Sequence, residues 1–180
     1  MADIQESQII SNVKNGQLES YSILVEKYHR GLVIHLYNLL NNQQSAEDVA
    51  QEAFIRAYNK ISLYNPEYAF STWLYKIADN IAFRQLKQTK PQLDISKIDN
   101  NLPSGDSSLA EHTDKLFAKE AVRVAVNKLP IQYRQVISLY YWDNFSYEDI
   151  AEIMEKPVGT IRTWLFRAKD DLRKELYGQI

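Results

Sequence analysis

The chain has 180 residues, of which 45% are hydrophobic and 24% charged, and its formal net charge is −2. This length suits one domain or two small ones, and the composition can supply a packed core. Cysteine is absent, which excludes disulfides, thiolate zinc sites and cysteine nucleophiles and suits a reducing compartment. With no signal peptide and no run of about 18 apolar residues, the sequence predicts a folded cytoplasmic protein.

The first half of the sequence predicts long amphipathic helices. Glycine and proline are rare, with five of each, and apolar residues recur at spacings of three and four, which favours an all-α fold. The stretch 21–40, "YSILVEKYHRGLVIHLYNLL", has this spacing throughout. Its expected buried stripe consists of Tyr21, Leu24, Val25, Tyr28, Leu32, Leu36, Leu39 and Leu40.

Two further helices follow in the first half. In "SAEDVAQEAFIRAYNKI", Ser45 is expected to cap the helix, and Asp48 completes a start that resembles a capping box. The expected buried side of this helix consists of Val49, Phe54, Ile55 and Tyr58. Pro66 marks a loop in "SLYNPEY", and "FSTWLYKIADNIAFRQLKQ", residues 70–88, predicts the next helix.

Aromatic residues and cations alternate from this loop into the helix after it. The aromatic residues are Tyr64, Tyr68, Phe70, Trp73, Tyr75 and Phe83, and the cations are Lys76, Arg84 and Lys87. Exposed aromatic rings stack on unpaired bases and cations follow the phosphates, so this pattern is typical of single-stranded DNA binding. A core role explains Trp73 and Phe83 equally well. Tyr68, Phe70 and Lys76 are expected to be exposed.

A polar stretch divides the chain. Residues 91–108 read "PQLDISKIDNNLPSGDSS", with two prolines and no sustained period. We therefore expect an N-terminal domain over residues 1–90, a flexible linker over residues 91–112 and a C-terminal domain over residues 113–180. The last of these reads as four helices with short joints, and Pro130 and Pro157 stand in first helical turns, where proline is tolerated.

The last two predicted helices form a helix-turn-helix. In "SYEDIAEIMEKPVGTIRTWLFRAK", Ser146 can cap the first helix, Ile150, Ala151 and Met154 face inward, and the second helix carries the basic residues. A recognition helix enters the major groove of DNA. Its candidate contacts with bases and phosphates are Thr160, Arg162, Thr163, Phe166, Arg167 and Lys169. The alternative is a helical hairpin whose solvated faces carry opposite charges.

Taken in order, "DVAQEAFIRAY", "FSTWLYKIADN", the polar linker and "PVGTIR" resemble the extracytoplasmic-function (ECF) sigma factors of bacteria over nearly the whole chain. The resemblance implies an alternative sigma factor that joins core RNA polymerase and recognises the minus-thirty-five and minus-ten promoter elements. It also implies promoter melting, a role in a stress or envelope response, and no enzymatic activity. An anti-sigma factor is a further implied partner, through which a cytoplasmic sigma factor is often held at the membrane.

The resemblance also assigns residues. It places polymerase contacts at Asp48, Gln51, Glu52 and Phe54, although a solvated helix face explains Asp48 and Glu52 equally well. It places contacts with flipped bases of the minus-ten element at Asn65, Tyr68, Phe70, Ser71, Trp73, Lys76, Asn80 and Arg84. It places contacts with the minus-thirty-five element at Thr160, Arg162, Thr163, Trp164, Phe166, Arg167 and Lys169.

Three residues depart from the family pattern. Asp79 stands where relatives usually carry a basic residue, and Arg84 stands where they usually carry an acidic one. Trp164 stands where they commonly carry arginine. We expect Asp79 to form a salt bridge with a neighbour instead of contacting phosphate. Trp164 is expected to pack on the domain or against the sugar edge of the DNA.

Other classes of function have less support in the sequence. The three histidines lack metal-ligand spacing, and no phosphate-binding loop or nucleophile motif occurs, so we expect no metal, no cofactor, no small-molecule substrate and no enzymatic activity. Two rival interpretations stay open at this point. One is a stand-alone helix-turn-helix regulator with an N-terminal sensor or dimerisation domain, and the other is an interaction protein that binds polymerase but not DNA.

Overall fold

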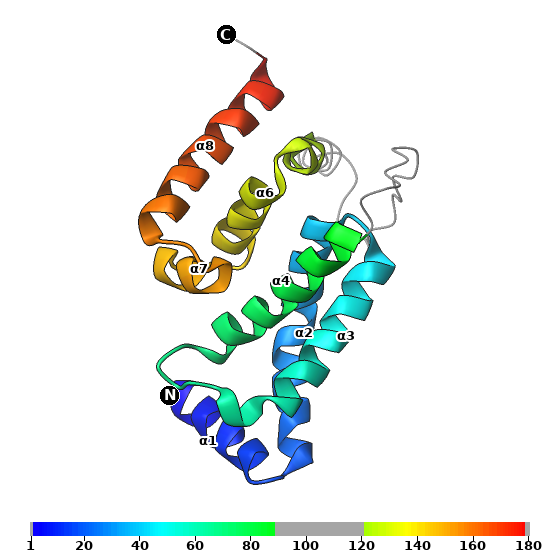
Figure 1. Cartoon of the computed structure of the whole chain (residues 1–180), viewed down its shortest axis with the longest axis vertical. Helices are drawn as coiled ribbons and strands as arrows, with labels where there is room; N and C mark the ends of the chain where they lie inside the picture. Colours follow the sequence, from blue (N-terminus) through cyan, green and yellow to red (C-terminus); the bar gives the residue numbers. More distant parts are fainter. Residues whose placement is uncertain (1, 89–120, 179–180) are drawn as a thin grey trace, which may run out of the picture.

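The computed structural model describes residues 2–88 and 121–178, which form two groups of helices (Figure 1). The first group contains α1 (Ala2–Lys14), α2 (Leu18–Leu40), α3 (Gln43–Asn59), the 3-10 helix η1 (Ile61–Leu63) and α4 (Phe70–Gln88). The second contains a helical stretch over residues 121–128, α6 (Ile131–Ile137), the π-helical turn η2 (Ser138–Trp142), α7 (Tyr147–Met154) and α8 (Val158–Tyr177). No strand occurs in these ranges, so the all-α prediction is confirmed.

Helix α2 is the centre of the first group. Of its predicted stripe, Tyr21, Leu24, Leu32, Leu36 and Leu39 are buried, and Val25, Tyr28 and Leu40 pack against the core. The buried surface of α2 is wider than the stripe, because α6 and η2 of the second group also pack on this helix. This packing buries His35 completely.

Helix α3 differs from its prediction at two places. Its N-cap is Asn42, whose side chain accepts a hydrogen bond of 2.8 Å from the backbone nitrogen of Ser45, so the prediction of Ser45 as the cap was wrong. Ile55 was expected on the buried side but is 55% exposed, whereas Phe54 is buried. The buried face of α3 is lined by Ala46, Ala50, Ala53 and Ala57, and Ile55 lies about 200° around the helix from Ala53, so it points away from this face.

Hydrogen bonds fix the conformation of the loop before α4. The hydroxyl of Tyr64, a buried residue, donates a hydrogen bond of 2.6 Å to the carbonyl oxygen of Tyr68. The side chain of Asn65 accepts a bond from the backbone nitrogen of Glu67, which turns the chain around Pro66. The loop predicted at Pro66 is therefore confirmed, and it presents Tyr68 outward.

The second group contains the predicted helix-turn-helix. Ser146 and Asp149 form a capping box at the start of α7, as the sequence predicted for Ser146. Glu155 ends the helix in a left-handed conformation with φ of 52°, and Pro157 directly precedes α8. Ile150 of α7 and Ile161 and Leu165 of α8 are buried between the two helices, while Ala151 and Met154 pack at the edge of this core.

The predicted linker over residues 91–112 and the exact domain boundary at residue 113 lie outside the described residues. Among the described residues the two groups are in direct contact, with α7 against α4 and with α6 and η2 against α2 (Figure 1). This contact places the helix-turn-helix beside the helix that carries the predicted minus-ten residues.

Candidate nucleic-acid interface

The outer face of α8 carries the exposed residues of the helix-turn-helix. Arg162, Thr163, Phe166, Arg167 and Lys169 are exposed, and the ring of Phe166 is 71% exposed. Thr160 and Trp164 are half-buried. The guanidinium of Arg162 lies over the ring of Tyr147 with its carbon 5.6 Å from the ring centroid. Such a face offers guanidinium groups to guanine and an aromatic ring to thymine methyl groups.

Trp164 packs against the core of the second group. Its indole therefore fills space within the domain, which is one of the two roles expected for it from the sequence. A packed indole leaves α8 one fewer phosphate contact than an arginine at this position would make.

The aromatic residues of the loop separate into a buried cluster and an exposed ring. Phe70 is completely buried, and the ring centroids of Tyr64 and Trp73 lie 5.8 Å from its own. Tyr68 is 43% exposed. The expectation that Phe70 is exposed was wrong. Its side chain is buried in the core under the loop, where it packs against the rings of Tyr64, Trp73 and Tyr28. Tyr68 is left as the ring available for stacking.

The other predicted minus-ten residues lie on the loop and along α4. Asn65 on the loop and Asn80 and Arg84 on α4 are exposed, and Ser71 and Trp73 are half-buried. The guanidinium of Arg84 lies 3.3 Å from Glu52 on α3. Arg84 is thus tied to a residue predicted to contact polymerase, and the two predicted surfaces join at this point.

The predicted polymerase surface on α3 is partly exposed. Asp48 and Gln51 are exposed, and Glu52, which is half-buried, pairs with Arg56 and Arg84. Phe54 was predicted to contact polymerase, but its side chain is only 5% exposed and belongs to the core. The apolar residue that α3 does present is Ile55. The prediction that Phe54 contacts polymerase therefore conflicts with its burial in the core.

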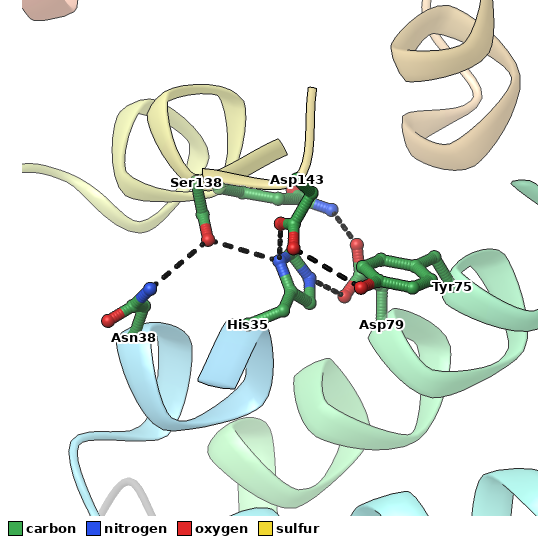
Figure 2. A network of polar contacts seen from close by, with 7 residues as sticks. His35, Asn38, Tyr75, Asp79, Ser138 and Asp143 are labelled. Atoms are coloured by element: carbon green, nitrogen blue, oxygen red, sulfur yellow. Dashed lines mark hydrogen bonds and ion pairs between the residues drawn. The ribbon is translucent and has the colours of Figure 1, made fainter. Parts of the chain in front are cut away.

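A buried polar centre joins the two groups of helices, as Figure 2 shows. His35 of α2 lies with Nε2 2.7 Å from a carboxylate oxygen of Asp79 of α4 and with Nδ1 3.0 Å from a carboxylate oxygen of Asp143, which follows η2. Nδ1 also lies 3.1 Å from the hydroxyl oxygen of Ser138. The π-helical turn η2 brings Ser138 and Asp143 to the same imidazole.

Further bonds surround this centre. The side-chain amide of Gln135 donates a bond of 2.6 Å to Asp79, and the hydroxyl of Tyr75 donates one of 3.2 Å to Asp143. A Cβ on residue 31 would lie 3.1 Å from that hydroxyl, so Gly31 is what allows Tyr75 to approach α2. The expected salt bridge of Asp79 is confirmed, and its burial removes it from any contact with phosphate.

The two carboxylates keep the imidazole charged. Burial by itself lowers the pKa of His35, but the charges and hydrogen bonds of Asp79 and Asp143 outweigh this effect and raise the pKa to about 10. Burial and the charge of Asp143 raise the pKa of Tyr75 above its ordinary value. At neutral pH the centre is therefore an imidazolium that donates to both carboxylates.

A second set of contacts lies along α4. The hydroxyl of Thr72 donates a bond of 2.9 Å to Asp149 of α7. The ammonium of Lys76 lies 2.8 Å from Glu152 and 3.1 Å from Glu155, next to the same helix. Burial acts to lower the pKa of Lys76, but these two carboxylates raise it overall. The acidic half of the helix-turn-helix therefore lies on α4.

Sequence reasoning missed the contact between the two groups. His35 and Asp143 belong to no sequence motif. The only signal for the contact was Asp79, an acidic residue where the family usually has a basic one. An acid in the middle of an apolar helix face indicates a buried partner.

Residues 24–91 match the family Sigma-70 region 2, and residues 119–172 match Sigma-70, region 4. Similar curated proteins include the RNA polymerase sigma-H factor of Pseudomonas aeruginosa, 33% identical over 96% of this chain and 94% of that protein. Others are the ECF RNA polymerase sigma factor SigW of Bacillus subtilis, 35% identical over 93% of this chain and 94% of SigW, and the ECF RNA polymerase sigma-E factor of Escherichia coli, 34% identical over 93% and 92%.

Solved structures share the fold. One is CnrH in complex with the cytosolic domain of CnrY, with a TM-score of 0.71, 19% identity and coverage of 96% of this chain and 97% of that one. Another is the sigma factor RpoE in complex with the anti-sigma factor NepR from Bartonella quintana, with a TM-score of 0.72, 23% identity and coverage of 88% and 98%.

The fold and the exposed faces define a two-part helical protein of transcription initiation, with a helix-turn-helix in its second part. The chain belongs to the ECF sigma factors of the sigma-70 family. It is an alternative sigma factor, a transcription initiation factor and not an enzyme, and its two domains fit binding to core RNA polymerase and promoter DNA.

The described part of the chain contains neither a metal-binding cluster nor a membrane-spanning helix. Within residues 2–88 and 121–178, no group of three or more His, Cys, Asp or Glu side chains is arranged to hold a metal ion. Over the same ranges, no helix is both long and apolar enough to cross a lipid bilayer.

Proposed function

We propose that the exposed face of α8 reads the minus-thirty-five element and that the loop and helix around Tyr68 capture unpaired bases of the minus-ten element. The observation that carries the first part is the outer face of α8, where Arg162, Phe166 and Arg167 are all exposed. Base-edge contacts come from Arg162 and Arg167, apolar contact from Phe166, and further hydrogen bonds from Thr160 and Thr163. Lys169 contacts a phosphate, and Trp164 supports the helix from within the domain.

The minus-ten part is carried by Tyr68. Its exposed ring stands beside Asn65 on the loop, and Ser71 and Asn80 supply hydrogen bonds from α4. Stacking of one base is worth about 1 to 3 kcal/mol, so an exposed ring of this kind offsets part of the cost of unpairing promoter DNA. Lys76 and Arg84 add contacts to the DNA backbone, and Trp73 with Phe70 beneath it supports the loop.

Core polymerase binds the outer face of α3 in this proposal. Asp48 and Gln51 supply polar contacts, Ile55 supplies an apolar one and Glu52 lies at the edge of the face. An exposed apolar side chain among polar ones is typical of a protein interface. Polymerase then holds the sigma factor on the promoter while both DNA contacts form, which raises the effective concentration of the second contact.

We also infer an anti-sigma factor as a regulatory partner, because two solved structures of similar fold are complexes of that kind. The chain would then reside in the cytoplasm and be held at the membrane through that partner in the uninduced cell. The stress or envelope role is consistent with the similarity to SigW and sigma-E. Fractionation of cells that express a tagged chain, before and after envelope stress, tests this location.

In vitro transcription tests the main proposal. Purified core polymerase with a genomic library should give specific transcripts only when the chain is added. Phe166→Ala with Arg167→Ala should abolish these transcripts at promoters that depend on a minus-thirty-five element. Tyr177→Ala is the matched control, because Tyr177 is an aromatic residue of the same helix and 76% exposed. Equal transcription by both variants would refute the assignment of α8.

A further inference from the structure

Helix α4 presents one face to the second group of helices. Thr72, Lys76 and Asp79 are spaced by about one helical turn, and each is bonded to a residue of α7 or α6. Thr72 is completely buried, and the side chain of Lys76 is 25% exposed. Lys76, one of the residues proposed to contact the minus-ten strand, is therefore already paired with acids of the chain itself.

The covering side chains have the charge of DNA. Glu152 and Glu155 supply two carboxylates to Lys76, and Asp149 accepts from Thr72. A phosphate would make the same two kinds of contact, an ion pair with an ammonium and a hydrogen bond from a hydroxyl. Lys76 therefore cannot bind DNA while it is paired with the acids of α7.

The His35 centre strengthens this contact at the other end of the interface. His35 belongs to the first group and Asp143 to the second, and both side chains are almost entirely buried, with exposures of 0% and 6%. Figure 2 shows that the centre also takes in Ser138 and Tyr75, so residues of both groups complete one network. Separating the groups exposes a charged pair to water and breaks several hydrogen bonds at once.

The closed arrangement also cannot reach both promoter elements. Their names place them about 25 base pairs apart, which is on the order of 85 Å of straight duplex at 3.4 Å per base pair. Helix α8 has 20 residues and so a length of about 30 Å, and α7 joins it directly to the surface of α4. The two groups must move apart before α4 and α8 occupy their elements together.

We propose that the free chain adopts an autoinhibited closed state, in which the acidic face of α7 occupies Lys76 in place of promoter DNA and the His35 centre holds the two groups together. The inference rests on the proposed role of α4 in binding the minus-ten strand. Core polymerase engages the chain in the open state, and opening precedes recognition of the minus-ten element.

A reversible cross-link tests the closed state in the full chain. The chain has no cysteine, and the side-chain amide of Asn127 in the second group donates a bond of 3.1 Å to Asn41 at the end of α2. Asn41→Cys with Asn127→Cys can therefore be joined by a short bis-maleimide that a reductant cleaves. With core polymerase, the joined protein should give only background transcription, and cleavage of the linker should restore the transcripts. The same protein after cleavage is its own control.

A pair of charge variants tests the role of the acids. The probe is a fluorescent single-stranded oligonucleotide with the non-template minus-ten sequence of a promoter found by transcription with the chain. Glu152→Gln with Glu155→Gln should tighten binding of this probe by the free chain about two- to thirtyfold, the range for loss of two partly exposed ion pairs. Glu19→Gln with Glu26→Gln is the matched control, since it changes net charge equally at two exposed residues of α2 and leaves the acids of α7 in place.

Each outcome decides between the two proposals. Equal transcription by the joined and the cleaved protein overturns the closed state and leaves the proposed function intact. Equal affinity of the two charge variants for the probe overturns the role of the α7 acids. Absence of specific transcripts with the unmodified chain overturns the proposed function, and the inference fails with it.

Discussion

Replacement of His35 by glutamine tests whether the buried centre stabilises the structure. Glutamine keeps one amide donor but carries no charge, so Asp79 and Asp143 would be left as two buried carboxylates without a cation. Asp79 retains its bond from Gln135, and Asp143 retains its bond from Tyr75. We expect His35→Gln to unfold more easily than the unaltered chain.

The magnitude follows from the burial of the centre. His35 and Asp79 are 0% and 3% exposed, and removing one partner of a buried ion pair costs about 3 to 5 kcal/mol. For a chain of this size, each kcal/mol lowers the melting temperature by roughly 2 to 4 °C. We therefore expect a decrease of roughly 6 to 20 °C, measured by circular dichroism at 222 nm.

The pH dependence identifies the imidazolium as the cause. The pKa of His35 is about 10 in the folded chain, against 6.5 as its ordinary value. The folded state therefore holds the proton more tightly, and this stabilisation is complete below pH 6.5 and is lost as the pH rises toward 10. The loss reaches at most about 1.4 kcal/mol per pH unit, because it involves one proton.

Urea unfolding at pH 7 and pH 9 measures this effect. The free energy of unfolding of the unaltered chain should fall by roughly 2 to 3 kcal/mol more than that of His35→Gln over this interval. Groups away from the centre titrate alike in both proteins, and burial with Asp143 keeps the pKa of Tyr75 above its ordinary value, so the difference reports on the His35 centre. Identical changes in the two proteins would refute the idea that a charged His35 holds the interface.

Three further substitutions separate structural from binding roles. Phe70→Ala should lower the free energy of unfolding by about 3 to 5 kcal/mol in urea, because it empties a fully buried site; a loss below about 1 kcal/mol would contradict a core role. Tyr68→Ala should leave the urea midpoint unchanged but weaken binding of the single-stranded minus-ten probe by about 1 to 3 kcal/mol, the cost of one stacked base; unchanged affinity would exclude stacking there. Ser146→Ala should cost about 0.5 to 2 kcal/mol in thermal unfolding through loss of the capping box at α7, and equal stability would show that the cap does not stabilise α7.

Local periodicity predicted much of the fold. The stripe on α2 and the capping box at Ser146 depend on residues within a few positions of one another, so they can be read directly from the sequence. The same holds for the exposed basic face of α8, since Arg162 and Arg167 differ in environment from buried Ile161 and Leu165 on the same helix. Periodicity was less reliable where a helix has two apolar neighbours in the chain, as at Phe54 and Ile55, because it cannot tell which of the two faces the core.

The sequence by itself determined that this protein is all-helical, that it carries a helix-turn-helix and that it resembles ECF sigma factors. Only the tertiary structure decided that Phe70 is a core residue and that Asp79 is buried under the second group of helices. It also brought together His35 with Asp79 and Asp143, which are 44 and 108 positions away from it in the chain. A contact across such a separation follows no helical period, because it depends on how two packed surfaces meet and not on the order of neighbouring residues.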